Sequence, residues 1–130
     1  MRKARGIRDD RRLSALMGGS LRKRDAPRGT RALTGLLDSW IGLSQSLIPS
    51  KEERDRVSSF LSSAGADMPF IRDLSSKDPF RRRRAARYLG YIDSERSSRA
   101  LVLALRQETE EPVMLFIVGA LANLGEAAAL

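Results

Sequence analysis

The chain has 130 residues with a formal net charge of +8, and it contains neither cysteine nor histidine. The lack of cysteine excludes disulfides and thiolate metal sites, and the lack of histidine removes the commonest general base and metal ligand. We therefore expect a protein that is not an enzyme and that holds no metal and no cofactor.

The positive charge is concentrated near the N-terminus. Residues 1–31 contain 11 Lys and Arg against 3 acids, which leaves 24 − 11 = 13 basic and 16 − 3 = 13 acidic residues that cancel in the rest of the chain. Residues 1–29 also hold few apolar side chains and several glycines, a composition typical of disorder. They are predicted to form a basic, largely disordered arm, which is either simply solvated or binds nucleic acid or an anionic membrane surface.

Membrane insertion and export are not indicated by the sequence. No apolar run approaches the roughly 18 residues that a membrane-spanning helix needs, and no apolar segment follows the basic N-terminus as it would in a signal peptide. With the absence of cysteine, this predicts a soluble, cytoplasmic protein.

A first helix is predicted over residues 30–48, with Thr30 as its N-cap and Pro49 ending it. Its apolar side chains recur every three or four residues and predict one buried stripe, made by Leu33, Leu36, Leu37, Trp40, Ile41, Leu47 and Ile48. Trp40 either packs in the core or belongs to a helix face that binds a partner.

Two shorter helices are predicted next. Ser50 and Glu53 have the spacing of a capping box, and Gly65 is the expected C-cap of the helix that follows. A short helix over residues 68–74 comes after it. Together these helices are predicted to form an irregular terminal repeat.

The helix predicted over residues 79–92 has two different faces. Ala85, Tyr88, Leu89 and Ile92 share the face assigned to the core. A nearly opposite stripe alternates aromatic rings with guanidinium groups and is our candidate partner-binding site: Phe80, Arg84, Arg87 and Tyr91, with Arg83 beside it. The alternative is a solvated face on which arginine stems cover the rings.

The two remaining helices differ in polarity. Residues 95–107 are expected to bury Leu101, Ala104 and Leu105 and to present Arg99, Leu103 and Arg106 on the other side. Residues 112–124 are apolar nearly all round, which predicts burial on more than one side. Since residues 126–130 are too few for a partner helix, we expect a longer solenoid or a homodimer, with an edge formed by Leu115, Phe116 and Val118.

The second half of the chain contains an internal repeat. Asp78-Pro79 recurs as Glu111-Pro112 after 33 residues, and residues 89–93 align with residues 121–125 at a spacing of 32. Such a period, with two helices in each unit, is typical of a helical solenoid.

The repeated motif resembles the HEAT repeat, in particular the short bacterial type of phycobilisome-lyase-like proteins. The resemblance is carried by Asp78-Pro79, an arginine, Ala85-Ala86, Leu89-Gly90, Ile92 and Asp93, followed by a second short helix rich in alanine and leucine. Arg81 stands where a valine is usual, and the second unit has Leu115-Phe116 in place of the arginine. The resemblance implies that the second helix of the repeat lines a concave surface, so that Arg99, Leu103 and Arg106 are inner-face contacts.

The expected fold is therefore an all-α, short HEAT-like α-solenoid over residues 30–130, incomplete at its C-terminus and preceded by the arm over residues 1–29. The expected function is a non-enzymatic protein-protein interaction scaffold. The alternative is a binder of nucleic acid or an anionic membrane that uses the arm and Arg83, Arg84 and Arg87. The hydroxylase branch of this repeat class needs His-Glu metal sites, which the sequence does not contain.

Overall fold

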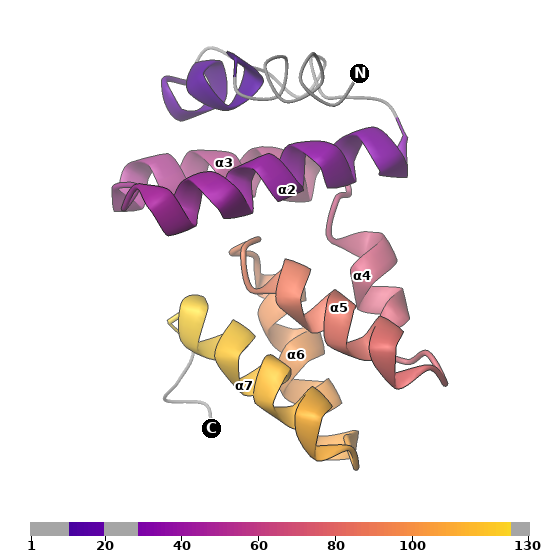
Figure 1. The fold of residues 1–130 in the computed structure, drawn as a ribbon. Coiled ribbons are helices and arrows are strands. Elements are labelled where there is room, and N and C mark those ends of the chain that lie inside the picture. Colours follow the sequence, from indigo (N-terminus) through magenta and orange to yellow (C-terminus); the bar gives the residue numbers. More distant parts are fainter. Residues whose placement is uncertain (1–10, 20–28, 126–130) are drawn as a thin grey trace. The chain divides into compact units, whose positions relative to one another are not determined.

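The computed structural model describes residues 11–19 and 29–125, and within these ranges the only regular elements are helices (Figure 1). The prediction of an all-α chain is confirmed for this part. Residues 11–17 are helical, and the helices that follow are α2 (Thr30–Ser46), α3 (Lys51–Ser63), α4 (Met68–Asp73), α5 (Pro79–Leu89), α6 (Glu95–Gln107) and α7 (Glu111–Asn123). The chain divides into two compact units, unit 1 (Met1–Ala66) and unit 2 (Asp67–Leu130). The sequence had placed its only boundary after residue 29.

In unit 1, α2 follows the predicted stripe for most of its length. Leu33, Leu36, Leu37, Trp40 and Ile41 are all buried. The helix ends at Ser46, however, so Leu47 and Ile48 no longer follow its periodicity and are 59% and 99% exposed. The predicted N-cap was also one residue late, because Gly29 is the cap and Thr30 is the first helical residue.

The capping box that begins α3 is confirmed. The backbone N–H of Glu53 donates to Ser50 Oγ at 3.1 Å, and the backbone N–H of Ser50 donates to Glu53 Oε1 at 2.9 Å. The pKa of the Glu53 carboxyl is lowered, first by the hydrogen bond from the Ser50 backbone N–H and then by the Ser50 side chain, because both stabilise its charged form. At the other end Ala64 is the C-cap, and Gly65 follows it with a φ of 78°, the left-handed conformation that glycine adopts without strain.

Part of the predicted arm belongs to the core of unit 1. Leu13 and Leu16 are 1% and 2% exposed, because their spacing places both side chains on one face of the helix over residues 11–17. Arg56 of α3 fixes the end of this helix by donating from Nη1 to the Met17 carbonyl oxygen at 2.6 Å. Residues 11–17 therefore differ from the expected disorder, while residues 1–10 and 20–28 of the arm lie outside the described residues.

In unit 2, α5 packs against α4 and α7, and α6 packs against α7. The predicted core face of α5 is confirmed, since Ala85, Tyr88, Leu89 and Ile92 are all buried. Helix α5 ends at Leu89, and Ile92 is reached through a tight turn in which its N–H donates to the Leu89 carbonyl at 3.2 Å. On α6 only Leu101 of the predicted buried residues is fully buried, whereas Ala104 and Leu105 are half-buried.

The backbones of α5 and α7 approach each other closely at Gly90, which follows α5. A Cβ atom at this position would lie 2.9 Å from the Cα atom of Ala120 and 3.0 Å from its Cβ atom. Since real Cβ atoms essentially never come so near, only glycine fits between the two helices without a shift.

Two ion pairs connect distant segments of unit 2. Arg96 binds the fully buried carboxylate of Asp67 with two atoms, Nη2 at 3.0 Å from Oδ1 and Nε at 3.2 Å from Oδ2, and Ser94 Oγ donates to the same Oδ2 at 3.3 Å. Arg82 Nε donates to Glu108 Oε1 at 2.7 Å. Both pairs join residues more than 25 positions apart and restrain the ends of the connecting segments.

Helix α7 differs from its prediction. Only one face is buried, formed by Val113, Ile117, Ala120 and Leu121. The opposite side chains are exposed within this chain, because the helices that contact α7, α5 and α6, leave that face uncovered. Residues 126–130, predicted to be too few for a partner helix, lie outside the described residues.

Candidate partner-binding surfaces

The rotation of α5 separates its arginines. The helix begins at Pro79, with the Asp78 Oδ1 atom accepting a hydrogen bond from the Phe80 N–H at 2.9 Å. Each following residue is turned by about 100° around the helix axis. As a result Arg82 turns into unit 2 toward Glu108, while the three arginines of the predicted site turn toward aromatic rings.

Arg83 lies between two exposed phenylalanines. Its guanidinium carbon is 5.1 Å from the centre of the Phe80 ring on α5 and 5.4 Å from the centre of the Phe116 ring on α7. Phe80 and Phe116 are 68% and 39% exposed. These cation–π contacts hold the guanidinium group at the junction of the two helices.

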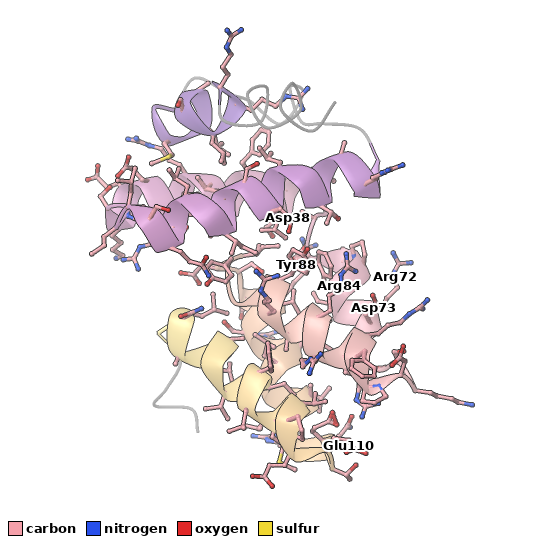
Figure 2. The ribbon with its side chains drawn as sticks, in the orientation of Figure 1. Asp38, Arg72, Asp73, Arg84, Tyr88 and Glu110 are labelled. Atoms are coloured by element: carbon pink, nitrogen blue, oxygen red, sulfur yellow. The ribbon has the colours of Figure 1, made fainter. Side chains whose placement is uncertain are left out.

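Arg84 and Arg87 share a second aromatic platform. The Arg84 guanidinium carbon is 5.0 Å from the centre of the Tyr88 ring (Figure 2). It is 5.6 Å from the ring centre of Phe70 on α4, and the Arg87 guanidinium carbon is 5.8 Å from the ring centre of Tyr88. The two rings stack on each other with centroids 4.6 Å apart and an interplanar angle of 21°. Both arginines are exposed, so a buried platform carries two solvent-facing cations.

The hydrogen-bonding capacity of these arginines is unused. Within residues 11–19 and 29–125, none of the three guanidinium groups contacts a carboxylate or another hydrogen-bond acceptor. A guanidinium group carries five N–H donors in its plane, and stacking on a ring uses its face rather than this edge. Arg83, Arg84 and Arg87 can therefore donate to carboxylates or phosphates of another molecule.

The predicted residues of α6 also come together. Arg99, Leu103 and Arg106 line a shallow hollow of about 630 Å³, along with Asp93, Ser94, Glu95, Ser98 and Val102. Leu103 is 55% exposed and supplies an apolar centre. Arg99 is paired with Glu95 at 2.6 Å, but both side chains are exposed, so this pair contributes little stability. The acidic side chains of this hollow, Asp93 before α6 and Glu95 at its first position, were not among the predicted residues.

The stripe predicted on α5 is divided by the structure. Phe80 groups with Arg83 and Phe116, whereas Arg84 and Arg87 group with Tyr88, which had been assigned to the core alone. Tyr91 is half-buried in the turn after α5. The spacing of four residues between Arg84 and Tyr88 could have indicated their contact. Phe70 and Phe116 belong to other helices, and no local pattern points to them.

The predicted edge of α7 is exposed in the chain. Leu115, Phe116 and Val118 are 66%, 39% and 36% exposed. Phe116 thus belongs both to this edge and to the contact with Arg83.

Neither a metal-ligand cluster nor a membrane-spanning helix occurs in residues 11–19 and 29–125. No group of three or more Asp, Glu, His or Cys side chains there is arranged to hold a metal ion. None of the described helices has both the length and the apolar character needed to cross a membrane.

Comparison with protein-family models, with curated proteins and with solved structures finds no match to this chain. The HEAT-like resemblance therefore rests on the motif in residues 78–93 and its partial recurrence.

Proposed function

We propose that this chain is a non-enzymatic, HEAT-like helical interaction module that binds an acidic surface of a partner protein in the cytoplasm. The observation that carries the proposal is the set of guanidinium groups of Arg83, Arg84 and Arg87, which rest on aromatic rings and have no acceptor in the described part of the chain. We define the α5 arginine face as these arginines together with Phe80 and Phe116.

The α5 arginine face has the composition of a protein interface. Arginine and aromatic residues are enriched among the side chains that dominate binding energies, and exposed rings such as Phe80 supply apolar contact area. The ring contacts also restrict the arginines before a partner arrives. Less side-chain entropy is then lost on binding than with freely moving side chains.

The HEAT-like part of the proposal is supported by the sequence motif and by the order of the helices. The Asp-Pro start of α5 and the Glu-Pro start of α7 flank α6, so each motif begins a helix. In this type of repeat α6 would line the concave surface. Its hollow around Leu103, with Arg99 and Arg106, is then a second contact area for a scaffold.

Binding of nucleic acid or an anionic membrane surface is the alternative. Helix α5 contains five arginines and no acid, and phosphate groups can accept the same hydrogen bonds as carboxylates. The two functions differ in salt dependence. Polyanion binding weakens steeply as salt rises, whereas an interface with buried rings keeps much of its affinity.

The proposal is tested by capturing partners from a lysate with the full chain and identifying them by mass spectrometry. The double variant Arg84→Glu and Arg87→Glu should not capture an acidic protein. Two hydrogen-bond donors are then replaced by two negative charges, which repel the acidic partner. The matched control, Arg31→Glu with Arg54→Glu, makes the same charge change at exposed positions of unit 1 and should leave capture intact.

Folding of both variants is checked by circular dichroism, since exposed changes of this kind usually alter the free energy of unfolding by only about 0.5 kcal/mol. Unchanged capture by the Arg84/Arg87 variant would contradict the proposal. Equal losses in both variants, with retention on heparin that vanishes in high salt, would instead favour the polyanion alternative.

A further inference from the structure

Arg84 and Arg87 are neighbours on one face of α5 and lie against the same aromatic ring. Residues three positions apart in a helix have Cβ atoms about 5 to 6 Å from each other. Their guanidinium carbons are 5.0 Å and 5.8 Å from the centre of the Tyr88 ring. Two positive charges are therefore held next to each other on the surface of unit 2, and both side chains are exposed.

These two charges are not compensated. Helix α5 contains five arginines and no Asp or Glu. Within residues 11–19 and 29–125, neither guanidinium group contacts a carboxylate, whereas the adjacent Arg82 has Glu108 at 2.7 Å. Like charges at helical spacing repel each other, so an anion that binds both arginines at once removes an unfavourable interaction.

The internal repeat shows that packing does not require arginine at these positions. At the spacing of 32 residues, Arg84 and Arg87 correspond to Phe116 and Gly119 of α7. All four residues are exposed, so this side of either helix accepts a large apolar residue, a glycine or a charged residue. The pair of arginines is therefore a property of α5 alone, and the packing of unit 2 does not explain it.

We infer that Arg84 and Arg87 together bind the phosphate group of a phosphorylated side chain in the partner protein. The inference rests on the proposed function and names the acidic group that the α5 arginine face recognises. A phosphate monoester has a charge of about −1.5 to −2 and three acceptor oxygens, so a single group accepts hydrogen bonds from both arginines and balances both charges. A carboxylate has one charge and two oxygens. Arginine clusters are a recurrent way of binding phosphorylated segments.

The exposed rings beside the pair favour a peptide over nucleic acid. Phe80 and Phe116 are 68% and 39% exposed and supply an apolar contact next to the phosphate site. Phe80 precedes the midpoint of Arg84 and Arg87 by five to six residues, a rise of about 8 Å, which an extended peptide covers in two to three residues. We expect an apolar side chain at that distance from the phosphorylated residue. Nucleic-acid phosphates carry one charge each and so balance the pair less well.

Fluorescence anisotropy of the full chain with three labelled peptides tests the inference. The peptides share one sequence, with a leucine three residues to either side of a central phosphoserine, glutamate or serine. The phosphoserine peptide should bind about ten-fold more tightly than the glutamate peptide, because it adds a hydrogen bond between charged groups. The serine peptide should bind most weakly. A phosphoserine peptide that binds no more tightly than the glutamate peptide would overturn the inference.

Paired substitutions locate the site. Arg84→Gln with Arg87→Gln should remove the preference for phosphoserine, whereas Arg31→Gln with Arg54→Gln, the same charge change at exposed positions of unit 1, should keep it. A preference that survives the first pair of substitutions contradicts the assignment. Tighter binding of a single-stranded oligonucleotide than of the phosphoserine peptide would likewise overturn it, in favour of the polyanion alternative.

Phosphatase treatment of the lysate separates this inference from the proposed function. Capture of the partner by the full chain should be lost after the treatment, because the monoester is hydrolysed. Capture that persists in the treated lysate and still depends on Arg84 and Arg87 would refute phosphate recognition and leave the proposed function standing. Capture that does not depend on these arginines in either lysate would contradict the proposed function itself.

Discussion

Adjacent arginines on α5 have different physical roles. Arg82 is largely buried, and besides Glu108 it donates from Nη1 to the carbonyl oxygens of Ser76 at 2.9 Å and Lys77 at 3.3 Å. The side chains of Arg82 and Glu108 are 17% and 5% exposed. Arg83 and Arg84 instead keep their N–H groups available. Position on the helix, rather than residue type, decides which arginine stabilises the fold and which can bind a partner.

Removal of the Arg82 guanidinium group should therefore destabilise the protein. Arg82→Met keeps much of the side-chain volume but leaves the buried Glu108 carboxylate and the two carbonyls without their donor, at a cost of about 3 kcal/mol. Arg81→Met, at the exposed neighbouring position, should change the free energy of unfolding by about 0.5 kcal/mol or less. Urea denaturation of both variants makes the comparison. Equal losses would show that the ion pair contributes nothing specific.

Local interactions could be predicted from the sequence at this scale, and distant ones could not. The Ser50–Glu53 capping box and the Asp78 cap depend on three-residue and two-residue spacings, which the sequence displays directly. The contact of Arg83 with Phe116 joins residues 33 positions apart and depends on how α5 and α7 pack. The aromatic supports of the candidate site were therefore found only in part.

In the described part of unit 2, the most extensive contact between helices is that of α5 with α7. Gly90 allows it, since the backbone of Ala120 occupies the space that a side chain would need. The backbone at Gly90 has an ordinary right-handed helical conformation, with φ −65° and ψ −10°. A substitution there would therefore be resisted by packing, and not by backbone strain.

Gly90→Ala should lower the free energy of unfolding by roughly 1 to 3 kcal/mol, the usual cost of overpacking a core. Gly42→Ala is the matched control, because Gly42 is an exposed helical glycine of α2 with no atom within 4 Å of an added Cβ. It should raise stability by up to about 1 kcal/mol through the better helix propensity of alanine. Thermal melts should show a lower melting temperature for Gly90→Ala and a higher one for Gly42→Ala. A higher melting temperature for Gly90→Ala would show that the two helices can move apart at little cost.

The bounds of the helices were predicted from the sequence more accurately than the burial of their faces. α6 has the predicted bounds, and the other predicted helices differ at their ends by one to three residues, since caps, prolines and glycines are local signals. The environment of α7 did not follow, because its composition is apolar all round while its neighbours contact only one side. Amphipathic spacing identifies a buried face, and an apolar helix without such spacing leaves the covered side undetermined.

At the scale of the whole chain, the division into units falls where the sequence showed no boundary. Asp67, the first residue of unit 2, has a fully buried carboxylate bound by Arg96. From the sequence, Asp67 was predicted to lie in a connection between two short helices. A carboxylate in such a connection is usually exposed. Its partner lies 29 residues away, so local reasoning could not find the pair.

The burial of Leu13 and Leu16 predicts that unit 1 depends on residues once assigned to the arm. Leu13→Ala and Leu16→Ala should each cost about 2 to 5 kcal/mol, as leucine truncations in cores do. Ile48→Ala, at a position 99% exposed, should have almost no effect. Thermal melts followed by circular dichroism compare the three variants. Unchanged melting of both leucine variants would restore the view of this segment as a solvated tail.

The positions of the aromatic residues give each unit its own chromophore. Trp40, the only tryptophan, is buried in unit 1, and both tyrosines, Tyr88 and Tyr91, belong to unit 2. Indole emission therefore reports the environment of the first unit, while the near-ultraviolet signal of the phenol rings reports the second. Without any label, a single sample shows whether the two halves of the chain lose their packing in one step or in two.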